Sequence, residues 1–378
     1  MKEGWTYKKL GEVCDTINGL WKGKKPPYVN VGVIRNANFT KEFTIRYDNI
    51  EYLDVEEKQY SKRKLQKGDL IIEKSGGGEK QPVGRAVLFE KEDGEYSFSN
   101  FTSVLRIKNN EELLSKFLYI YLLFIYKRGD TLSMQRATTG IHNIEFDKYL
   151  SIKIPCISLS EQQRIVSRLD SAFAHIDELK ANAEKQLSEA RTLFQKALTK
   201  AMEPKEGWEE FIFSEIIKLQ SGDYLSSKDY VNGEYPVYGG NGITGYHNQY
   251  NKNGNIIVVG RVGALCGNVH YIDNPIWLTD NGFEVIVKKN IDINMKFLCC
   301  YLEYMDLGKY ARQTAQPVIS NSSLKEIPLY IPPLTEQQRI VSRLDSLSAH
   351  VRELEEVTQK TIAECDALKQ ALLRKVFE

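Results

Sequence analysis

One stretch of this sequence occurs twice: Glu161-Gln162-Gln163-Arg164-Ile165-Val166-Ser167-Arg168-Leu169-Asp170-Ser171 is found again, unchanged, from Glu336 to Ser346, 175 residues later. A weaker second match pairs Lys2-Glu3-Gly4-Trp5 with Lys205-Glu206-Gly207-Trp208. The chain is therefore predicted to contain two copies of one unit, each a globular part followed by a helix. Two long copies are too few for a solenoid and indicate internal two-fold symmetry.

Both copies of the repeated stretch are predicted to be helical, over residues 158–204 and 333–378. Ser160 and Thr335 stand at N-cap positions with a glutamine three residues on, which predicts a capping box in each copy. Apolar residues then recur at spacings of three and four, as in a coiled-coil seam of about six heptads. The predicted seam residues are Ile165, Leu169, Ala172, Ile176, Leu179, Ala183, Leu187, Ala190, Phe194, Ala197 and Ala201, then Ile340, Leu344, Leu347, Val351, Leu354, Ile362, Cys365, Leu368, Leu372 and Val376. The two helices are predicted to pair antiparallel; the alternative is two separate surface helices.

The remaining segments, 1–157 and 205–332, are predicted to be mixed-β domains. Apolar, β-branched runs predict strands at 69–72, 86–89, 104–107, 256–259 and 283–287, separated by glycine- and asparagine-rich turns. Each domain closes with an apolar helical stretch that contains the letters Lys-Phe-Leu. The predicted fold class is α+β: two mixed-β domains separated by two long helices that form an antiparallel coiled coil, in a pseudo-two-fold repeat.

Composition describes an ordinary globular chain of 378 residues, long enough for two or three domains with their own cores. The formal net charge is +1, with five excess positive charges over 1–157 and three excess negative charges over 205–332. This balance does not by itself indicate a nucleic-acid-binding protein. No apolar run reaches membrane-spanning length, and the six cysteines have no metal-ligand spacing. These features predict a reduced cytoplasmic protein with no membrane partner.

Three apparent catalytic motifs fail when their surroundings are considered. Residues 240–245 spell GxGxxG, but no helix start follows to hold a pyrophosphate. The glycines of 74–80 lack the spacing of a phosphate-binding loop. Lys25-Pro26-Pro27-Tyr28 resembles the Asn-Pro-Pro-Tyr motif of adenine methyltransferases, but a lysine replaces the amide that accepts the amino proton. The chain is therefore predicted to be non-catalytic, with no metal or cofactor of its own.

The motifs at the helix starts carry a resemblance to a known family. Leu-Ser-Glu-Gln-Gln-Arg-Ile-Val (159–166) and Leu-Thr-Glu-Gln-Gln-Arg-Ile-Val (334–341) follow the proline-containing ends of the two domains, and a Gly-Trp pair opens each domain. Over essentially the whole chain this arrangement resembles the specificity subunit of type I restriction–modification enzymes. The resemblance implies two target-recognition domains, each reading one half of a split site in double-stranded DNA. It also implies a helix pair that sets their spacing and docks two methyltransferase subunits. Translocase/nuclease subunits complete the implied complex, and S-adenosylmethionine and ATP are expected on these partner subunits.

Candidate DNA-binding residues are cations, amides and one tyrosine on or beside the glycine-rich turns, because such groups meet phosphates and base edges. In the first domain they are Lys22, Lys24, Lys25, Lys74, Lys80, Arg85 and Arg136; in the second they are Tyr238, Asn241, Arg261, Arg312, Gln313 and Gln316. The alternative for each of them is to be a solvated surface side chain. For Tyr238, a place in the core is a further alternative.

Candidate partner-binding residues come from the repeated stretch, because two copies of one subunit would meet two copies of one surface. They are Glu161, Gln162, Arg164, Arg168, Glu336, Gln337, Arg339 and Arg343. Packing against similar domain ends is the alternative explanation of the repeat. A coiled-coil adaptor, whose domains bind peptide or glycan, is the alternative function for the whole chain.

Overall fold

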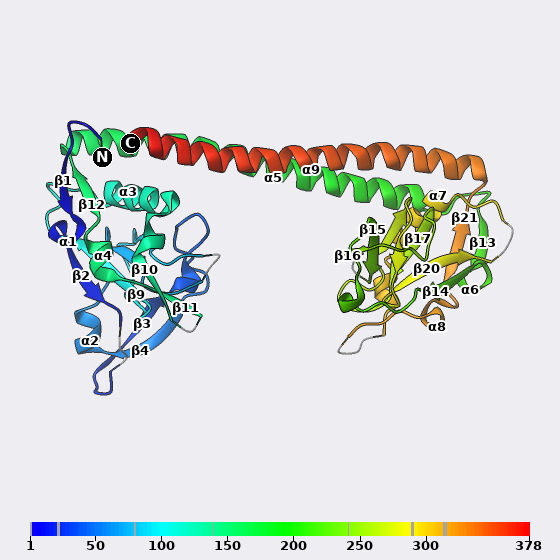
Figure 1. Cartoon of the computed structure of the whole chain (residues 1–378), viewed down its shortest axis with the longest axis horizontal. Helices are drawn as coiled ribbons and strands as arrows, with labels where there is room; N and C mark the ends of the chain where they lie inside the picture. Colours follow the sequence, from blue (N-terminus) through cyan, green and yellow to red (C-terminus); the bar gives the residue numbers. More distant parts are fainter. Residues whose placement is uncertain are drawn as a thin grey trace. The chain divides into compact units, whose positions relative to one another are not determined.

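A computed structural model describes residues 2–20, 23–78, 81–138, 140–240, 242–288, 291–312 and 316–378. It divides into two compact units (Figure 1). The first unit consists of Met1–Asn182 and Lys360–Glu378, and the second of Ala183–Gln359. Each unit therefore combines one globular domain with parts of both long helices.

The long helices are α5 (Leu159–Met202) and α9 (Leu334–Phe377), each of 44 residues. Within the second unit, Thr358 Oγ1 donates to the carbonyl of Ala183 at 3.5 Å, and Arg191 Nη2 lies 2.6 Å from Glu355 Oε1. From the first contact to the second, the residue number rises on α5 and falls on α9, so the helices pair antiparallel. In the first unit, Lys369 Nζ donates to Asp177 Oδ1 at 2.5 Å. The predicted fold class, with its antiparallel helix pair, is confirmed.

Two details of the helix prediction are wrong. The helices begin at Leu159 and Leu334, so Ser160 and Thr335 lie inside them and are not N-cap residues. In the first helix, Ser158 Oγ accepts a hydrogen bond from the backbone of Glu161, at 3.3 Å. Leu179 and Leu368 are 58% and 49% exposed and leave the seam. An α-helix drifts by about 20° per heptad relative to a 3.5-residue repeat, so a strictly heptad seam rotates off the contact line. Ile176 and Cys365 of the predicted seam are buried, and so is Thr358, which the predicted seam did not include.

The first domain contains three small sheets and a two-stranded ribbon. Strand orders are β2-β9-β5-β7, β4-β3-β8, β10-β11-β6 and β1-β12. The strands are β1 (Thr6–Lys9), β2 (Cys14–Asn18), β3 (Tyr28–Ile34), β4 (Glu51–Glu56), β5 (Leu70–Glu73), β6 (Ser75–Gly77), β7 (Ala86–Leu88), β8 (Tyr96–Phe98), β9 (Thr102–Ile107), β10 (Gln135–Thr138), β11 (Ile141–Ile144) and β12 (Lys153–Cys156). The helices are α1 (Leu10–Val13), α2 (Glu57–Ser61), α3 (Ser115–Arg128) and α4 (Phe146–Leu150), with 3-10 turns at Asn36–Asn38 and Asp130–Met134.

Among the described residues, the second domain repeats this topology with fewer strands. Its strand orders are β14-β20-β17-β18, β16-β15-β19 and β13-β21. The strands are β13 (Glu209–Ile212), β14 (Ile217–Ser221), β15 (Tyr235–Gly239), β16 (Gly242–His247), β17 (Ile256–Gly260), β18 (Val269–Ile272), β19 (Trp277–Leu278), β20 (Gly282–Val287) and β21 (Pro328–Ile331). The helices are α6 (Phe213–Ile216), α7 (Met295–Tyr304) and α8 (Asn321–Leu324), with 3-10 turns at Ser227–Asp229 and Leu307–Tyr310.

The matching sheets establish which elements correspond. In both domains the first strand of the four-stranded sheet is an edge strand, and the β3–β8 and β15–β19 pairs are both parallel. The strand predictions at 69–72, 86–89, 104–107, 256–259 and 283–287 are confirmed by β5, β7, β9, β17 and β20. The third sheet of the first domain is reduced in the second to isolated bridges, which join Val318 to Val262 and to Arg312.

Each core joins a domain to both long helices. In the first unit, α3 lies between the helix pair and the sheets (Figure 1). Phe117 of α3 packs with Phe377 of α9, whose ring centroid is 5.9 Å away, and Trp5 covers Phe377 at 6.3 Å. In the second unit, Phe297 of α7 packs with Trp208 at 6.2 Å, in a core that contains Met202 of α5. The Gly-Trp and Lys-Phe-Leu repeats are therefore core contacts that hold a domain on the helices.

Candidate nucleic-acid interface and partner surface

In the first domain, two predicted DNA-binding cations meet at the small sheet β10-β11-β6. Lys74 links β5 to β6, and its carbonyl accepts from the backbone of Ile144 at 2.8 Å. Arg136 on β10 is exposed and lies opposite Asn143 on β11, which in turn lies opposite Ser75 on β6. Gly76, with a φ of 109°, turns the glycine-rich strand at this point. This sheet thus carries Arg136 and Asn143, an asparagine that the sequence interpretation missed, and Lys74 directly precedes its strand β6.

The second domain places two arginines at the corresponding positions. Arg261 follows β17 as Lys74 follows β5, and its carbonyl accepts from the backbone of Ile319 at 3.0 Å. Arg312 is exposed and bridges to Val318, as Arg136 pairs with Asn143. The Arg261 guanidinium donates to the carbonyl of Asp280 at 3.1 Å. Both domains therefore present a cation after the equivalent core strand and an arginine on the facing segment.

One predicted DNA-binding residue belongs to the core. Arg85 is 8% exposed, and its guanidinium donates to both carboxylate oxygens of Glu73, at 2.6 and 3.1 Å. The same group lies over the ring of Phe39 at 5.5 Å. Because its charge is neutralised inside the domain, the prediction that Arg85 contacts DNA is wrong.

The other candidates are less closely grouped. Tyr238 is half-buried against Val258 and Leu278, and burial raises the pKa of its hydroxyl. The backbone amides of Lys24 and Lys25 donate to Glu56 Oε2, at 3.2 and 3.4 Å, while both side chains are exposed. Gln316 is also exposed. Lys22, Lys80, Asn241 and Gln313 lie outside the described residues.

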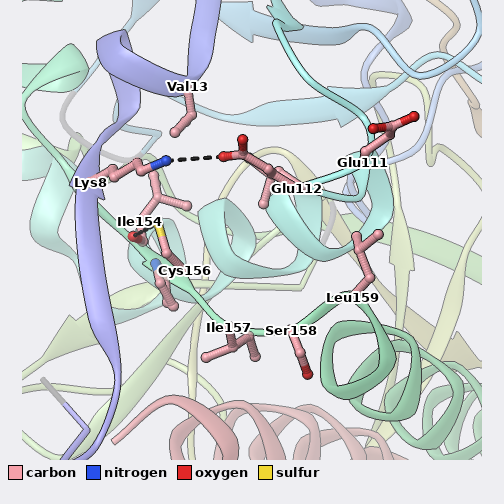
Figure 2. Close-up of a pocket in the computed structure, with 11 residues that line it drawn as sticks. Lys8, Val13, Glu111, Glu112, Ile154, Cys156, Ile157, Ser158 and Leu159 are labelled. Atoms are coloured by element: carbon pink, nitrogen blue, oxygen red, sulfur yellow. Dashed lines mark hydrogen bonds and ion pairs between the residues drawn. The ribbon is translucent and has the colours of Figure 1, made fainter.

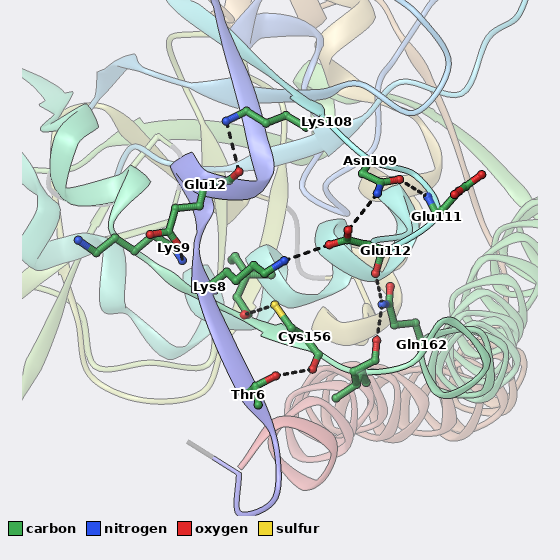
Figure 3. Close-up of polar contacts among 12 residues, drawn as sticks. Thr6, Lys8, Lys9, Glu12, Lys108, Asn109, Glu111, Glu112, Cys156 and Gln162 are labelled. Carbon is green, nitrogen blue, oxygen red and sulfur yellow. Dashed lines mark hydrogen bonds and ion pairs between the residues drawn. The ribbon is translucent and has the colours of Figure 1, made fainter.

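The repeated glutamines Gln162 and Gln337 are structural, which corrects their assignment to a partner surface. Both are 0% exposed. Gln162 Nε2 donates to the carbonyl of Glu112 at 2.8 Å (Figure 3). It also donates to the carbonyl of Ile157 at 2.9 Å, and its Oε1 accepts from the Leu114 amide at 2.9 Å. Gln337 makes the same three bonds, with the carbonyls of Asp292 and Pro332 and the amide of Asn294. Each glutamine ties the start of a long helix to the loop that precedes α3 or α7.

Replacing Gln162 by leucine is expected to destabilise the first unit by about 3 kcal/mol, because a buried amide and two carbonyls lose their partners. The measurement is urea unfolding, together with hydrogen exchange at the Leu114 amide, which should lose protection. Gln163→Leu is the matched control: the neighbouring glutamine is exposed, so its effect should stay within about 0.5 kcal/mol. Equal effects of the two variants would contradict the assigned role of Gln162.

The remaining candidate partner-binding residues are at the surface. Arg164 donates to both carboxylate oxygens of Glu161, at 2.7 and 2.5 Å, and Arg339 donates to both oxygens of Glu336, at 2.8 and 2.7 Å. Hydrogen bonds from these arginines hold the pKa of both carboxyl groups below the ordinary value, with Lys2 and Arg168 contributing at Glu161 and Lys205 at Glu336. Arg168 and Arg343 are exposed.

A pocket of about 300 Å³ opens beside the first of these helix starts (Figure 2). It lies between β1, the loop before α3 and the junction of β12 with α5. Lys8 Nζ donates to Glu112 Oε2 across it at 3.0 Å, and the Cys156 thiol lines it. In the part of the chain that the structure describes, no group of three or more His, Cys, Asp or Glu residues could hold a metal ion. No described helix is long and apolar enough to span a bilayer.

Comparison with known families decides the membership of the chain. A family model described as "Type I restriction modification DNA specificity domain" matches residues 2–189 and 205–364. The chain belongs to this family. The proposed resemblance is therefore confirmed, and one matched segment lies in each copy of the repeat.

Two members of the specificity family align with the full length of this chain, and a third aligns with part of it. The StySPI specificity subunit of Salmonella potsdam is 24% identical over 433 aligned residues, covering 100% of this chain and 89% of that protein. The EcoKI subunit of Escherichia coli K12 is 23% identical with the same coverage. The Escherichia coli EcoprrI subunit is 32% identical over 150 residues, which cover 38% of this chain and 37% of that protein.

Two solved structures show the same fold. One, described as the structural basis of complex assembly and conformational transition of a type I R-M system, superposes with a TM-score of 0.78. It is 20% identical and covers 100% of this chain and 98% of that chain. The HsdS subunit of Thermoanaerobacter tengcongensis gives a TM-score of 0.55 at 20% identity, over 100% and 97% of the two chains.

Proposed function

We propose that this chain is the DNA-specificity subunit of a type I restriction–modification complex and reads a bipartite site, one half with each domain. The observation that carries the proposal is the corresponding placement of Lys74 with Arg136 and of Arg261 with Arg312 on two domains of one topology. Arginine can pair with guanine edges through two hydrogen bonds, and lysine meets phosphates. The two domains share a topology but differ in the residues at these positions, as expected if they recognise two different half-sites.

The chain is a non-catalytic subunit in this proposal, and its partners perform the chemistry. Two methyltransferase subunits dock on the repeated surfaces at the helix starts, and translocase/nuclease subunits join them. S-adenosylmethionine and ATP bind to those partners, in the cytoplasm. The family membership supports this role over a coiled-coil adaptor that binds peptide or glycan.

The acidic balance of the second domain fits this division of labour. Residues 205–332 carry three excess negative charges, which would weaken a DNA interface built from this domain alone. Methyltransferase subunits would supply phosphate contacts, so that this chain supplies mainly the base contacts. The complete complex should therefore bind DNA more tightly than the isolated chain.

Sequencing the methylated adenines of the host, with and without this gene, tests the proposal. A bipartite, interrupted methyl-adenine motif is expected to disappear on deletion and to return when the gene is restored. Persistence of every such motif would contradict the proposal. Methyl transfer by the highly purified single chain would contradict its non-catalytic part.

A further inference from the structure

The turn before β9 lies beside Lys74, and the turn before β20 lies beside Arg261. The backbone amides of Lys74 and Ser75 both donate to the carbonyl of Phe101, at 2.9 and 3.1 Å. In the second domain, the backbone amide of Arg261 donates to the carbonyl of Asn281 at 3.0 Å. Each turn is therefore fastened to the segment that carries a proposed DNA-binding cation.

The two turns correspond in backbone geometry. Each is closed by a hydrogen bond from its fourth amide to its first carbonyl, at 3.0 Å in 99–102 and at 3.1 Å in 279–282. The register of the sheets agrees, because β9 begins opposite the end of β5 and β20 begins opposite the end of β17. Phe101 and Asn281 therefore occupy the same position, the third residue of a hydrogen-bonded turn.

The side chains at this shared position are exposed and chemically different. Phe101 is 51% exposed, and among the described residues it joins none of the hydrophobic clusters of the first domain. Asn281 is exposed as well. Single exposed apolar residues are common on protein surfaces, so exposure alone assigns no role. The position does, because it places an apolar ring beside Lys74 and an amide beside Arg261.

The difference between the two side chains favours DNA over a protein partner. Two copies of one partner subunit would meet two like surfaces, and an apolar ring is not like an amide. Two half-sites of different sequence, in contrast, would meet different side chains. Phosphates are the same in every sequence, so residues that differ between matching turns are expected at base edges.

We propose that Phe101 and Asn281 are specificity-determining residues, each of which reads one base pair of its half-site in the major groove. Phe101 packs against the 5-methyl group of a thymine, and Asn281 forms paired hydrogen bonds with N6 and N7 of an adenine. Because backbone hydrogen bonds fix both turns, little of either turn has to become ordered when DNA binds. This inference rests on the proposed function and adds the class of base that each turn recognises.

The test measures how tightly the complex of this chain with its methyltransferase subunit binds duplexes that carry the methylated site. In the half-site that changes when residues 1–157 are exchanged, each thymine is replaced in turn by uracil, which lacks only the 5-methyl group. At one of these thymines, wild type should lose about four-fold in affinity, as expected for one buried methyl group. Phe101→Ala should bind the thymine and uracil duplexes equally, and Phe101→Leu should keep part of the preference.

A parallel measurement applies to the second domain. In the other half-site, each adenine is replaced in turn by 7-deazaadenine, which lacks the N7 acceptor of one of the two proposed hydrogen bonds. Wild type should lose about five-fold in affinity at one adenine, as expected for one hydrogen bond. Asn281→Ala should bind the two duplexes equally.

Matched controls separate base reading from folding and from general affinity. Tyr52→Ala removes another ring of the first domain, 55% exposed, and should leave the uracil effect as in wild type. Lys74→Ala should weaken binding to the thymine and uracil duplexes alike, because a phosphate contact carries no sequence information. Since the Phe101 side chain lies outside the core clusters, Phe101→Ala should unfold at the same urea concentration as wild type.

The outcomes are distinguishable. A complex that binds the methylated site no better than other sequences would overturn the proposed function. Selective binding without any uracil effect, or with a uracil effect that persists in Phe101→Ala, would overturn only the reading by Phe101. Equal loss of affinity for every sequence in Phe101→Ala would assign the ring to a wedge between base pairs and overturn the same reading. A 7-deazaadenine effect that is absent, or that persists in Asn281→Ala, would overturn the reading by Asn281.

Discussion

Exchange of residues 1–157 for the first domain of another specificity-family member is expected to change one half of the methylated site and leave the other half intact. The first domain has its own core, around Phe117 and Leu105, and the second domain packs separately around Phe297 and Val259. Because each recognition surface is supported by the core of its own domain, exchange of a domain should transfer its recognition surface as well. The whole original motif should therefore vanish from the methylome and be replaced by a hybrid.

Methylome sequencing of a strain that carries the exchanged gene provides the measurement. The matched control exchanges residues 205–332 instead and should change the other half-site only. The incoming domain should be able to form the three hydrogen bonds that Gln162 makes in this chain, because they join α5 to the first domain. Simultaneous change of both half-sites in one exchange would show that the domains read DNA jointly.

Insertion of one heptad into both long helices, near Gln186 and Thr361, is expected to lengthen the unread spacer of the site by about three base pairs. Seven residues add about 10.5 Å of helix, and base pairs stack roughly 3.4 Å apart. The two insertion points are equivalent positions of the repeat, 175 residues apart. A heptad keeps the seam in register to within about 20°. The half-site sequences should stay unchanged.

Two further variants serve as controls for the heptad insertion. A heptad added to α5 alone leaves seven residues without a mate and should abolish methylation. Insertion of three residues into both helices shifts the seam out of register and should do the same. An active double-heptad variant that kept the original spacer would show that the helix pair does not measure the distance.

The sequence predicted the long helices and the central strands well, because local residue patterns encode both. The apolar periodicity predicted α5 and α9, and β-branched runs predicted β5, β9, β17 and β20. Periodicity could not predict where the seam runs, since drift along a helix leaves Leu179 at the flank while Thr358, a polar residue, is buried. The sheets around β3 and β15 were also missed, because β3 contains the exposed Asn30 and β15 contains Pro236 and Gly239, residue types that are depleted in strands.

The candidate site was harder to predict, because function and folding use the same residue types. Identity between two copies cannot distinguish a residue that meets a partner from one that fastens a helix, and Gln162 and Gln337 are of the second kind. Arg85 follows a glycine-rich turn as a DNA-binding cation would, but β7 pairs with β5 and brings it to Glu73. Asn143 could have been found only from the register of β11.

The division of the first unit between two distant segments affects the order in which the chain folds during synthesis. The second unit is one continuous stretch, Ala183–Gln359, whereas the first needs Lys360–Glu378 to be complete. Leu373 and Phe377, only 2% and 4% exposed, close the core of the domain that the ribosome makes first. Domains of most proteins mature from the N-terminus as they emerge. Here the second unit is complete before the first, and the apolar surface around Phe117 stays uncovered until residues 360–378 have been made.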